Sequence, residues 1–542
     1  MPPSTGPRTG GAASAAAARL AGEADARAAA PLLNCLLREA AERVEAPGSA
    51  PGRVSGETPG SVPGQAPGDP RPTYRLLGTG RLLRVRGTRR PADPELRTAG
   101  GHWQPLTHTA LVEVVAEELT RHTGRTNAEL PGEMRDSRDV VAALLAARAD
   151  TEPPADPYLL SEQSLLTGHP HHPAPKARGG GPVAAWLPYA PEAYARFPLT
   201  LLGLRADTVV EDGDTSALDA LGTAPPGYRL LPAHPWQLAL LGDRLAAAFA
   251  DGRLIRLGAT PADVWPTAAI RTVYAPDADL FLKFSLDVRI TNDIRRLWRH
   301  DLLRLRRTDT AATAAFAAQG APGGGGGGWL GDQGYRTAAF AFEELAVLSR
   351  QGLRPHLAPG TTPYLAAALT EGFPGSPLAA ATDPARWWEA YLAAVVPPVL
   401  AAFADRGVVV EAHLQNALVV CAADGTPVRA LYRDAEGVKL VEDVGRAAGW
   451  ERLVYCLVVN HLVEIAAALA EQHPALDPWP AARRELSRHA LPEIPALLTA
   501  ETLPGKTNLL LRWTDADGAD ARYRPLPNPL RPEAALTDPR IT

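Results

Sequence analysis

Basic and hydroxyl side chains gather in residues 269–296, which run AIRTVY and then, after a short gap, FLKFSLDVRITNDIRR. Alternation places Arg271 and Thr272 on opposite faces of one predicted strand. On the next strand, residues 281–288, Lys283 belongs to a charged face and its neighbours to an apolar face. We expect Thr291 and the asparagine after it to cap a helix, with Arg295 one turn inside.

This mixture of side chains suits a polyanion. A lysine supplies a point charge, arginine a two-pronged donor, and hydroxyls and a helix N-terminus further hydrogen bonds. The alternative is an exposed sheet face with scattered ion pairs. That alternative leaves unexplained why the basic and hydroxyl residues continue into the predicted cap.

A second group lies in VEAHLQNALVV, residues 410–420, and YRDAEG, residues 432–437. His413 and its polar neighbours alternate in phase on a predicted strand, and Asn416 follows. Asp434 and Glu436 are two residues apart, so a strand would direct both carboxylates to one side. Such groups beside phosphate binders are typical of Mg²⁺–nucleotide chemistry, because Mg²⁺ prefers oxygen ligands shared with phosphates. A buried polar network explains the pattern equally well.

Two shorter motifs precede these. Residues 168–180, GHPHHPAPKARGG, hold His169, His171, His172, Lys176 and Arg178. The segment contains no acidic or cysteine partner for a metal, so we favour a cationic rim for phosphate or carboxylate over a metal site. A solvated basic loop is as plausible from this segment alone. Residues 231–237, LPAHPWQ, predict a helix entry with a packed Trp236.

The elements that must position these groups alternate between helices and strands. We expect a helix at 31–44, a strand pair around residues 78–80, helices at 111–122 and 137–149, and two strands joined by a turn at 275–277 that lead into a helix. Further strands are expected at 408–420 and 430–440 around a turn at 424–425, and helices over 442–500. Residues 1–28 and the linker 46–72 are expected to be disordered, and the glycine run 323–328 to be a flexible insertion.

Composition excludes several classes. The 542 residues suggest two to four structural units, and a net charge of −5 gives no general attraction to nucleic acid or an anionic membrane. Three separated cysteines, Cys35, Cys421 and Cys456, form no CxxC pair, which argues against a disulfide framework or a metal cluster. We find no secretory signal, and we expect the apolar residues 453–469 to form a buried helix. A soluble, cytoplasmic protein is therefore expected.

Taken in order, these motifs resemble the IucA/IucC family of siderophore synthetases, which work without a peptide-synthetase assembly line. The resemblance spans residues 31–513. Its motifs are GHPxHPxxKxRxG at 168–180, HPWQ at 234–237, the strand lysine Lys283, TNxxR at 291–295, ExHxQN at 411–416, RDxEG at 433–437 and KxxLxxR at 506–512.

The resemblance implies an α+β, multi-domain, cupped-hand fold with a central ATP cleft. A tail and linker (1–72, with the helix 31–44) would precede a thumb-like region (73–265), a fingers-like region (266–400) and a palm-like region (401–542). It implies Mg²⁺-dependent adenylation of a small carboxylic acid such as citrate or a succinyl-type acid, release of pyrophosphate, and attack by an amine or hydroxylamine. The partners are then small molecules, without nucleic acid or membrane, and a homodimer is possible.

Site residues follow from the matched positions. The resemblance assigns Arg271, Lys283 and His413 to catalysis and Asp434 and Glu436 to Mg²⁺. The nucleotide contacts would be His171, Arg271, Thr272, Lys283, Arg350, His413, Asn416 and Asp434, and the acid contacts Thr291, Arg295, His413 and Lys506.

One residue departs from the family pattern. The family has Ser-x-Arg-Thr where this chain has Ala269-Ile270-Arg271-Thr272, which removes a hydroxyl donor worth ~1.5–3 kcal/mol if it bonds a charged phosphate. A degenerate, non-catalytic binder is one alternative on this ground. A kinase-like phosphotransferase shares the Lys, Asn and Asp residue types but would need HRD and DFG segments, which are absent. An iron–siderophore reductase would need a cysteine-ligated cluster. The sequence does not identify the acid or the amine.

Overall fold

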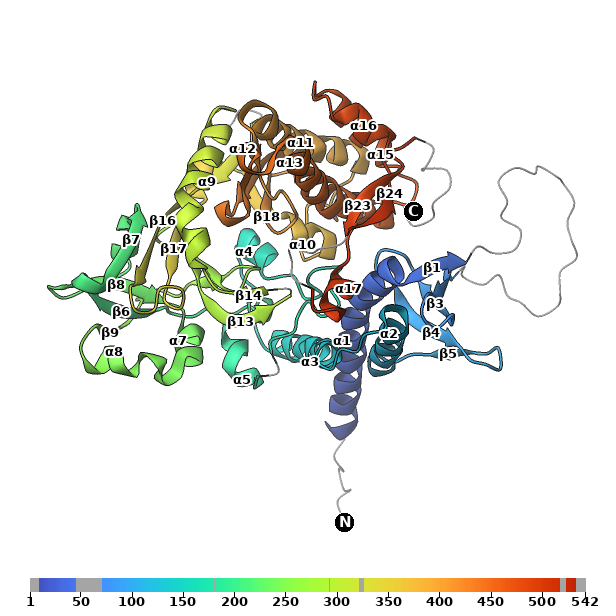
Figure 1. Ribbon diagram of the computed structural model, residues 1–542, viewed down its shortest axis with the longest axis horizontal. Helices are drawn as coiled ribbons and strands as arrows, with labels where there is room; N and C mark the ends of the chain where they lie inside the picture. The colour runs from blue at the N-terminus through green and yellow to red at the C-terminus, as the bar shows by residue number, and fades with distance from the viewer. Residues whose placement is uncertain are drawn as a thin grey trace, which may run out of the picture. The chain divides into compact units, whose positions relative to one another are not determined.

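The computed structural model describes residues 9–44, 71–179, 181–291, 293–320, 326–516 and 523–532. The chain forms two compact units, coloured along the chain in Figure 1. The first consists of Met1–Ala142, Thr167–Gly180 and Lys506–Arg524, and the second of Ala143–Leu166, Gly181–Gly505 and Pro525–Thr542. These units do not follow the three consecutive regions expected from the sequence, and that division stays a prediction.

The first unit is built on a five-stranded antiparallel sheet in the order β1-β2-β3-β4-β5. Leucines of the N-terminal helix and of α2 pack with the sheet and with α17 in one apolar core. The strands are β1 (Ala41–Val44), β2 (Thr73–Leu76), β3 (Leu82–Arg86), β4 (Ala92–Arg97) and β5 (Trp103–Pro105), and the helices are α1 (Thr9–Glu39), α2 (His108–Thr123), α3 (Leu130–Ala149, which continues into the second unit) and α17 (Asn508–Trp513). The strand pair around residues 78–80 and the helices over 111–122 and 137–149 are confirmed.

The N-terminal expectations are wrong in two respects. Residues 9–28 are helical, as part of α1, rather than disordered. Alanine is the best helix former, and Ala24 and Ala28 are small enough to be buried, while Asp25 pairs with Arg138 at 2.7 Å. The helix expected at 31–44 ends at Glu39, because residues 41–44 pair with β2 as a strand.

The second unit contains the sheets that carry the candidate site. A six-stranded sheet has the order β10-β11-β12-β17-β16-β7, and a three-stranded sheet the order β8-β6-β9. Their strands are β6 (Thr200–Arg205), β7 (Val209–Gly213), β8 (Tyr228–Ala233), β9 (Leu254–Ala259), β10 (Trp265–Pro266), β11 (Thr272–Ala275), β12 (Leu280–Phe284), β16 (Asp332–Ala338) and β17 (Val347–Gln351). The helices of this part are α4 (Pro157–Glu162), α5 (Val183–Trp186), α6 (Ser216–Asp219), α7 (Pro235–Leu241) and α8 (Ala246–Ala250).

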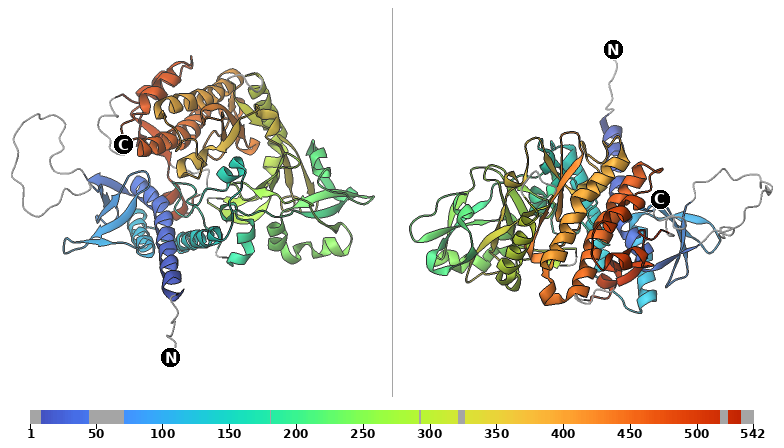
Figure 2. Two further views of the ribbon diagram at one scale, coloured as in Figure 1. Left: turned by 180° about the vertical axis from the view of Figure 1, so that it is seen from behind. Right: turned by 90° about the horizontal axis from the view of Figure 1, so that it is seen from above.

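A four-stranded sheet in the order β15-β21-β20-β18 lies against the longest helices of this unit. Helix α11 packs on β21 and contacts α9 and α15, as Figures 1 and 2 show. The strands are β15 (Gly328–Leu330), β18 (Thr362–Leu365), β20 (Ala417–Cys421) and β21 (Pro427–Arg433), with the short pair β19 (Val408–Val409) and β22 (Lys439–Leu440) beside them. The helices are α9 (Arg299–Ala317), α10 (Ala366–Glu371), α11 (Pro384–Arg406), α12 (Val441–Val444), α13 (Arg446–Leu453), α14 (Val463–Gln472), α15 (Trp479–Ser487) and α16 (Ile494–Thr499), and β23 (Thr502–Lys506) and β24 (Tyr523–Pro527) follow.

Two helices of the described residues are long and apolar enough to cross a membrane by length and composition alone, Pro384–Arg406 and Arg446–Gln472. Of their most apolar stretches, 67% and 83% of the residues are buried inside the structure. Both helices therefore serve as core helices here. The buried helix expected at 453–469 is confirmed, and a π-helical segment, Val454–Leu462, interrupts it.

The region 270–295 is partly as expected. β11 and β12 pair antiparallel around the predicted turn. The strand expected over 281–288 breaks at Ser285, whose hydroxyl accepts from the backbone N–H of Leu297 at 2.9 Å. Its supposed charged face is wrong as well, because Phe281 shares that face with Lys283 and all of β12 is buried. The chain then enters a hairpin, β13 (Leu286–Ile290) and β14 (Asp293–Arg295), where a helix was expected.

Two further expectations need correction. The strand over 408–420 is interrupted, because residues 410–416 form a loop between β19 and β20. The glycine run is not a flexible insertion throughout. Residues 321–325 lie outside the described part, but a Cβ on Gly327 would stand 2.5 Å from Pro398, and Gly328 begins β15. Close packing, and not flexibility alone, therefore explains why the last glycines are there.

Candidate active site

The candidate site begins on the six-stranded sheet. Thr272 of β11 lies opposite Lys283 of β12, so both side chains belong to the same face. On the other side of β12, Arg350 of β17 lies opposite Phe281. Phe281 and Lys283 are two residues apart, so Arg350 shares that face as well. The strand register thus brings together a threonine, a lysine and an arginine that are far apart in the sequence.

Two carboxylates that follow β21 contact the ammonium group of Lys283. Nζ donates to Asp434 Oδ1 at 2.5 Å and to Glu436 Oε2 at 2.8 Å. Burial alone would raise the pKa of Asp434, but Lys283 and Arg350 outweigh it and hold that pKa well below its usual range. The pKa of Glu436 is also lowered, since Lys283 and Arg271 outweigh the effect of burial. Both carboxylates are therefore charged at neutral pH.

Two arginines extend this group. Arg350 donates from Nη2 to Asp434 Oδ1 at 3.1 Å, and from Nε to Oδ1 of the buried Asp332 at 2.6 Å. Arg271 approaches Glu436 Oε2 at 3.4 Å through Nη2. With the lysine, three cations face three carboxylates, and their formal charges cancel. We call these six residues, Arg271, Lys283, Asp332, Arg350, Asp434 and Glu436, the charge cluster.

The two carboxylates reach Lys283 by a route that the sequence did not predict. Asp434 and Glu436 do not lie on a strand. β21 ends at Arg433, Asp434 has a φ of 85°, and Glu436 is in a single 3₁₀ turn, Ala435–Gly437. A non-glycine residue at positive φ is strained, and the surrounding contacts must hold it. The N–H of Ala435 supplies one such contact by donating to Asp332 Oδ2 at 3.1 Å.

His413 and Asn416 lie in the loop between β19 and β20, so the prediction of a strand there is wrong. Asn416 Nδ2 lies 3.4 Å from His413 Nε2, and the backbone N–H of Asn416 donates to the His413 carbonyl at 3.0 Å. Burial lowers the pKa of His413 to about 4, although the charge of Asp434 acts in the opposite direction. The imidazole is therefore neutral at pH 7, and it offers hydrogen bonds and no charge.

The π-helical segment supports this loop. His461 is fully buried, and its Nδ1 lies 2.7 Å from the carbonyl of Ala412, immediately before His413. Its Nε2 lies 2.5 Å from the hydroxyl of Tyr391. Burial lowers the pKa of His461 to about 4, so the ring is neutral and must donate from Nδ1 to the carbonyl. Sequence reasoning missed this residue, since a lone histidine in an apolar run gives no signal of its role.

Thr291 and Arg295 belong to the β13–β14 hairpin. Thr291 is the turn residue, with a φ of 62°, and Asn292 lies outside the described residues. Arg295 is on β14, where its Nη2 donates to Thr291 Oγ1 and to the carbonyl of Ile290, both at 2.6 Å. The predicted helix cap is wrong, because a threonine–asparagine pair suits a tight turn as well as a cap.

Arg295 has no carboxylate partner among the described residues, unlike the cations of the charge cluster. Burial, and then the charge of Arg271, lower the pKa of Arg295 to about 10, which still leaves it charged at pH 7. A desolvated cation without a counter-ion is unfavourable. Nη1 of Arg271 donates to the carbonyls of Arg295 and Arg296 at 3.1 and 2.8 Å, so Arg271 links the charge cluster to this hairpin.

His171 and Lys506 belong to the first unit. His171 Nε2 lies 3.0 Å from Nη2 of Arg38, and the His171 carbonyl accepts from the side chain of Asn508 at 2.6 Å. Lys506 is the last residue of β23 and is half-buried. The segment 168–179 is not a solvated loop throughout, because His172, Lys176 and Arg178 are buried, although His169 is exposed.

Two further carboxylates were missed. Asp332 is buried in the charge cluster, and nothing in its local pattern marks it. Glu162, fully buried, accepts from Arg433 Nη1 at 2.6 Å and from the hydroxyl of Tyr158 at 2.9 Å. This ion pair holds the end of β21 directly before Asp434. The sequence motif YRDAEG contains Arg433, but it gives no indication of Glu162, because that partner is far away in the sequence.

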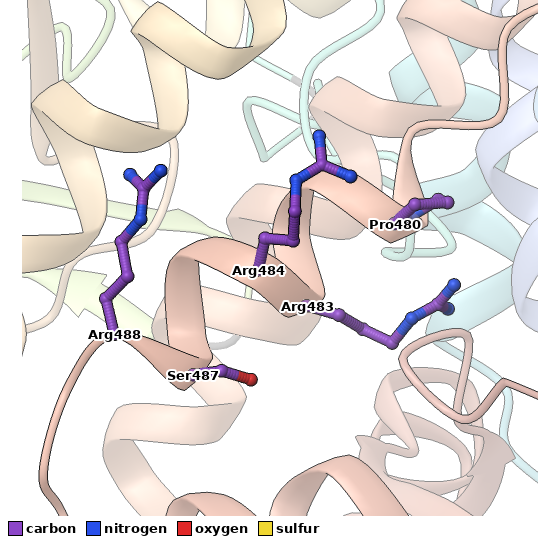
Figure 3. A pocket seen from close by; sticks show the side chains of 5 residues that line it. All are labelled: Pro480, Arg483, Arg484, Ser487 and Arg488. Atoms are coloured by element: carbon purple, nitrogen blue, oxygen red, sulfur yellow. The ribbon is translucent and has the colours of Figure 1, made fainter.

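A surface depression of about 570 Å³ lies along α15 and is lined by Pro480, Arg483, Arg484, Ser487 and Arg488 (Figure 3). It contains none of the predicted site residues. Arg484 pairs with Glu389 at 2.7 Å, and Arg488 pairs with Glu485 at 2.6 Å. Two of its three arginines thus have carboxylate partners, and the charge cluster and the hairpin remain the candidate site.

Comparison with known proteins shows which proteins this chain resembles. The model of the IucA / IucC family matches residues 157–371, and that of the ferric iron reductase FhuF-like transporter family matches residues 385–521. An L-2,3-diaminopropanoate–citrate ligase of Staphylococcus aureus is 29% identical over 69% of this chain and 75% of its own length. The rhizobactin siderophore biosynthesis protein RhbC of Rhizobium meliloti is 28% identical over 76% of this chain and 81% of its own length.

Solved structures share the fold. The ATP-bound aerobactin synthetase IucA of Klebsiella pneumoniae aligns with a TM-score of 0.76 at 21% identity, covering 93% of this chain and 99% of that one. The petrobactin biosynthesis protein AsbB of Bacillus anthracis aligns with a TM-score of 0.74 at 15% identity, covering 96% of each chain. These likenesses confirm the α+β, multi-domain fold class. Residues 157–371 match the IucA / IucC family, and over most of its length the chain is similar to siderophore synthetases.

Proposed function

We propose that this protein is an ATP-dependent ligase that adenylates a carboxyl group of citrate or a similar polycarboxylic acid and joins it to an amine in siderophore biosynthesis. The observation that carries the proposal is the pairing of two unlike regions. The charge cluster holds lysine, arginine and carboxylate groups suited to a nucleotide. Arg271 joins it to a hairpin in which Arg295 has no carboxylate partner among the residues that the structure describes.

The nucleotide is assigned to the charge cluster and its neighbours. Lys283, Arg271 and Arg350 would contact phosphate oxygens, with the hydroxyl of Thr272 on the same sheet face. The neutral His413 and Asn416 would add hydrogen bonds without adding charge. Such donors stabilise the negative charge that develops on the departing pyrophosphate, which is the largest catalytic contribution expected at this kind of site.

The donor set also fits Mg²⁺. Asp434 and Glu436 supply two oxygen ligands, and Mg²⁺ is usually held by one or two carboxylates together with substrate phosphates and water. No group of three or more His, Cys, Asp or Glu side chains among the described residues could hold a metal alone, which agrees with a metal that arrives with its nucleotide. Bound there, Mg²⁺ would neutralise phosphate charge.

The acid is assigned to the hairpin. Among the described residues, Arg295 makes its hydrogen bonds to the hairpin through Nη2, and its other N–H groups are directed to no described partner. A carboxylate there would neutralise the half-buried cation and match the planar donor pair of a guanidinium. Thr291 supplies a hydroxyl beside it. On the motif resemblance alone, we also assign Lys506 to the acid and His171 to the nucleotide.

The reaction then proceeds in two steps. A carboxylate oxygen of the acid attacks the α-phosphorus of ATP, the bond to the β-phosphate oxygen breaks, and pyrophosphate leaves. The amine nitrogen attacks the acyl carbon, AMP leaves with the carboxyl oxygen, and the amine loses a proton. The printed names of relatives support citrate and amine substrates, since they include a spermidine–citrate ligase of Bacillus anthracis and a D-ornithine–citrate ligase of Staphylococcus aureus. A cytoplasmic location and a homodimer remain predictions.

ATP–pyrophosphate exchange against a panel of carboxylic acids tests the proposal. We expect exchange that depends on citrate or a related polycarboxylic acid, and AMP as the product once an amine is added. ADP in place of AMP would support the kinase-like alternative. Absence of exchange with every polycarboxylic acid would support the non-catalytic binder. The match to FhuF-like proteins does not favour a reductase, because Cys421 and Cys456 within it are buried and too few to ligate a cluster.

A further inference from the structure

The HPWQ motif is only partly explained by packing. His234 caps α7, since its Nδ1 accepts from the N–H of Trp236 at 3.2 Å. Trp236 is buried and stacks on Tyr189, with 6.3 Å between ring centroids. Gln237 remains, a polar residue that is 3% exposed. Burying an amide is unfavourable unless its hydrogen bonds are satisfied, so its partners indicate its role.

The partners of Gln237 lie on the acid-binding hairpin and on the segment before β17. Its Oε1 accepts from the backbone N–H of Asp287 at 2.8 Å. Its Nε2 donates to the carbonyl of Glu344 at 3.0 Å and lies 3.4 Å from Asp287 Oδ1. The amide therefore holds β13 by both its backbone and its side chain.

Asp287 passes this restraint across the hairpin. Arg296 donates to its carboxylate from Nε at 2.6 Å and from Nη2 at 2.8 Å, and Arg244 donates at 2.7 Å. Burial alone would raise the pKa of Asp287, but Arg296 and Arg244 lower it to about 2, so the carboxylate is charged. Arg296 directly follows Arg295, so the restraint ends one residue from the proposed acid contact.

The hairpin is thus held at its base from two sides. On one side Arg271 donates to the carbonyls of Arg295 and Arg296. On the other side, Gln237 bonds to Asp287 of β13, and Asp287 accepts from Arg296. A buried amide with a purely structural role would explain three satisfied hydrogen bonds. It would not explain why two of the three hydrogen bonds are made with Asp287, whose carboxylate accepts from Arg296.

We propose that Gln237 is a positioning residue for acid binding, which acts through Asp287 and Arg296 to fix the backbone that carries Arg295. This inference rests on the proposed function, because it assigns the hairpin to the acid. The three hydrogen bonds of the Gln237 amide end on Asp287 and Glu344, which lie outside the charge cluster. Loss of the amide should therefore weaken acid binding and leave nucleotide binding unchanged.

The test replaces Gln237 by methionine, which keeps length and volume and removes all three hydrogen bonds. Gln163→Met is the matched control, because Gln163 is a buried glutamine of the same unit that donates to the carbonyls of Ala195 and Pro266. We expect Gln237→Met to raise the KM for citrate about tenfold, as for a loss of ~1.4 kcal/mol, with the KM for ATP within about twofold. In Gln163→Met, the KM for citrate should not rise more than the KM for ATP. If Gln237→Met changes both KM values by the same factor, or changes neither, the proposal is wrong.

Hydrogen exchange supplies a readout that needs no activity. Peptides covering residues 286–296 should exchange faster in Gln237→Met, while residues 272–284 should be unchanged. Asp287→Asn, which keeps the side-chain shape, should have the same effect if Gln237→Met fails to fold. Unchanged exchange at 286–296 in a folded variant overturns the positioning role. If wild-type protein exchanges no pyrophosphate with any acid, the proposed function fails, whereas the hydrogen-exchange result still decides whether Gln237 holds the hairpin.

Discussion

The charge cluster and the hairpin differ in how their charges are balanced. In the cluster, each cation has a carboxylate partner, and Lys283 has both Asp434 and Glu436. In the hairpin, Arg295 contacts a hydroxyl and a carbonyl, and no carboxylate among the described residues. Both regions are basic in sequence. Only the structure separates the balanced one from the unbalanced one.

This difference indicates how each region would receive its ligand. A nucleotide must replace ion pairs that the cluster already contains, so its charge and that of Mg²⁺ should arrive together. Arg295 has no ion pair with a described residue, so a carboxylate there would supply a counter-ion without displacing one of them. The cluster should therefore determine nucleotide binding and catalysis, and the hairpin should determine affinity for the acid.

The largest effect should come from Lys283→Ala. Its ammonium group contacts both Asp434 and Glu436, and its removal takes away one of the three cations proposed to contact the phosphates. We expect ATP–pyrophosphate exchange to fall about 10²–10³-fold, the range for loss of one charge-stabilising donor. Lys439→Ala, at a half-buried lysine outside the cluster, is the control. Near wild-type exchange in Lys283→Ala would remove this residue from the site.

Arg295→Lys should have the next largest effect. Lysine keeps the charge but loses the planar pair of donors that matches a carboxylate. We expect the KM for the acid to rise about tenfold or more and the KM for ATP to stay within about twofold. Steady-state kinetics with each substrate varied separately measure this. Arg299→Lys, at an exposed arginine after the hairpin, should change neither constant.

The balance of the cluster also predicts a pH dependence of stability. The folded-state pKa of Asp434 is lower than the unfolded value of about 3.9, so its contribution is present above that pH and is lost as the pH falls below it. Asp434→Asn should lower the melting temperature at pH 7, and the difference from wild type should narrow towards pH 3. Asp405→Asn, at an exposed position, should show no such trend. A constant difference for Asp434→Asn at all pH values would contradict the ion-pair account.

Ala269→Ser should have the smallest effect. It restores the hydroxyl that the family has next to the cluster, at a half-buried position. We expect a gain in nucleotide affinity of a few-fold, at the low end of a hydrogen bond to a charged group. Titration calorimetry with Mg·ATP measures it. A loss of affinity would show that the loop before Arg271 is packed for alanine.

The sequence indicated residues that the structure brings together, but it mispredicted parts of their backbone. Alternating side chains in residues 271–274 and 281–288 indicated two strands, because side chains in a strand have a period of two. The structure pairs these strands, with Thr272 opposite Lys283. It failed at Thr291, since a threonine–asparagine pair is compatible with a helix cap and with a turn at positive φ. Asp332 was not predictable, because its role comes from contacts with Arg350 and the N–H of Ala435, which only the folded chain brings together.

Separate titration of Mg·ATP and of citrate into Lys283→Ala and Arg295→Lys tests the division between the two regions most directly. We predict that Lys283→Ala weakens Mg·ATP binding by more than about tenfold and leaves citrate binding nearly unchanged. We predict the reverse for Arg295→Lys. If both variants weaken both ligands to the same extent, the cluster and the hairpin form one undivided site, and the assignment of nucleotide to one and acid to the other is wrong.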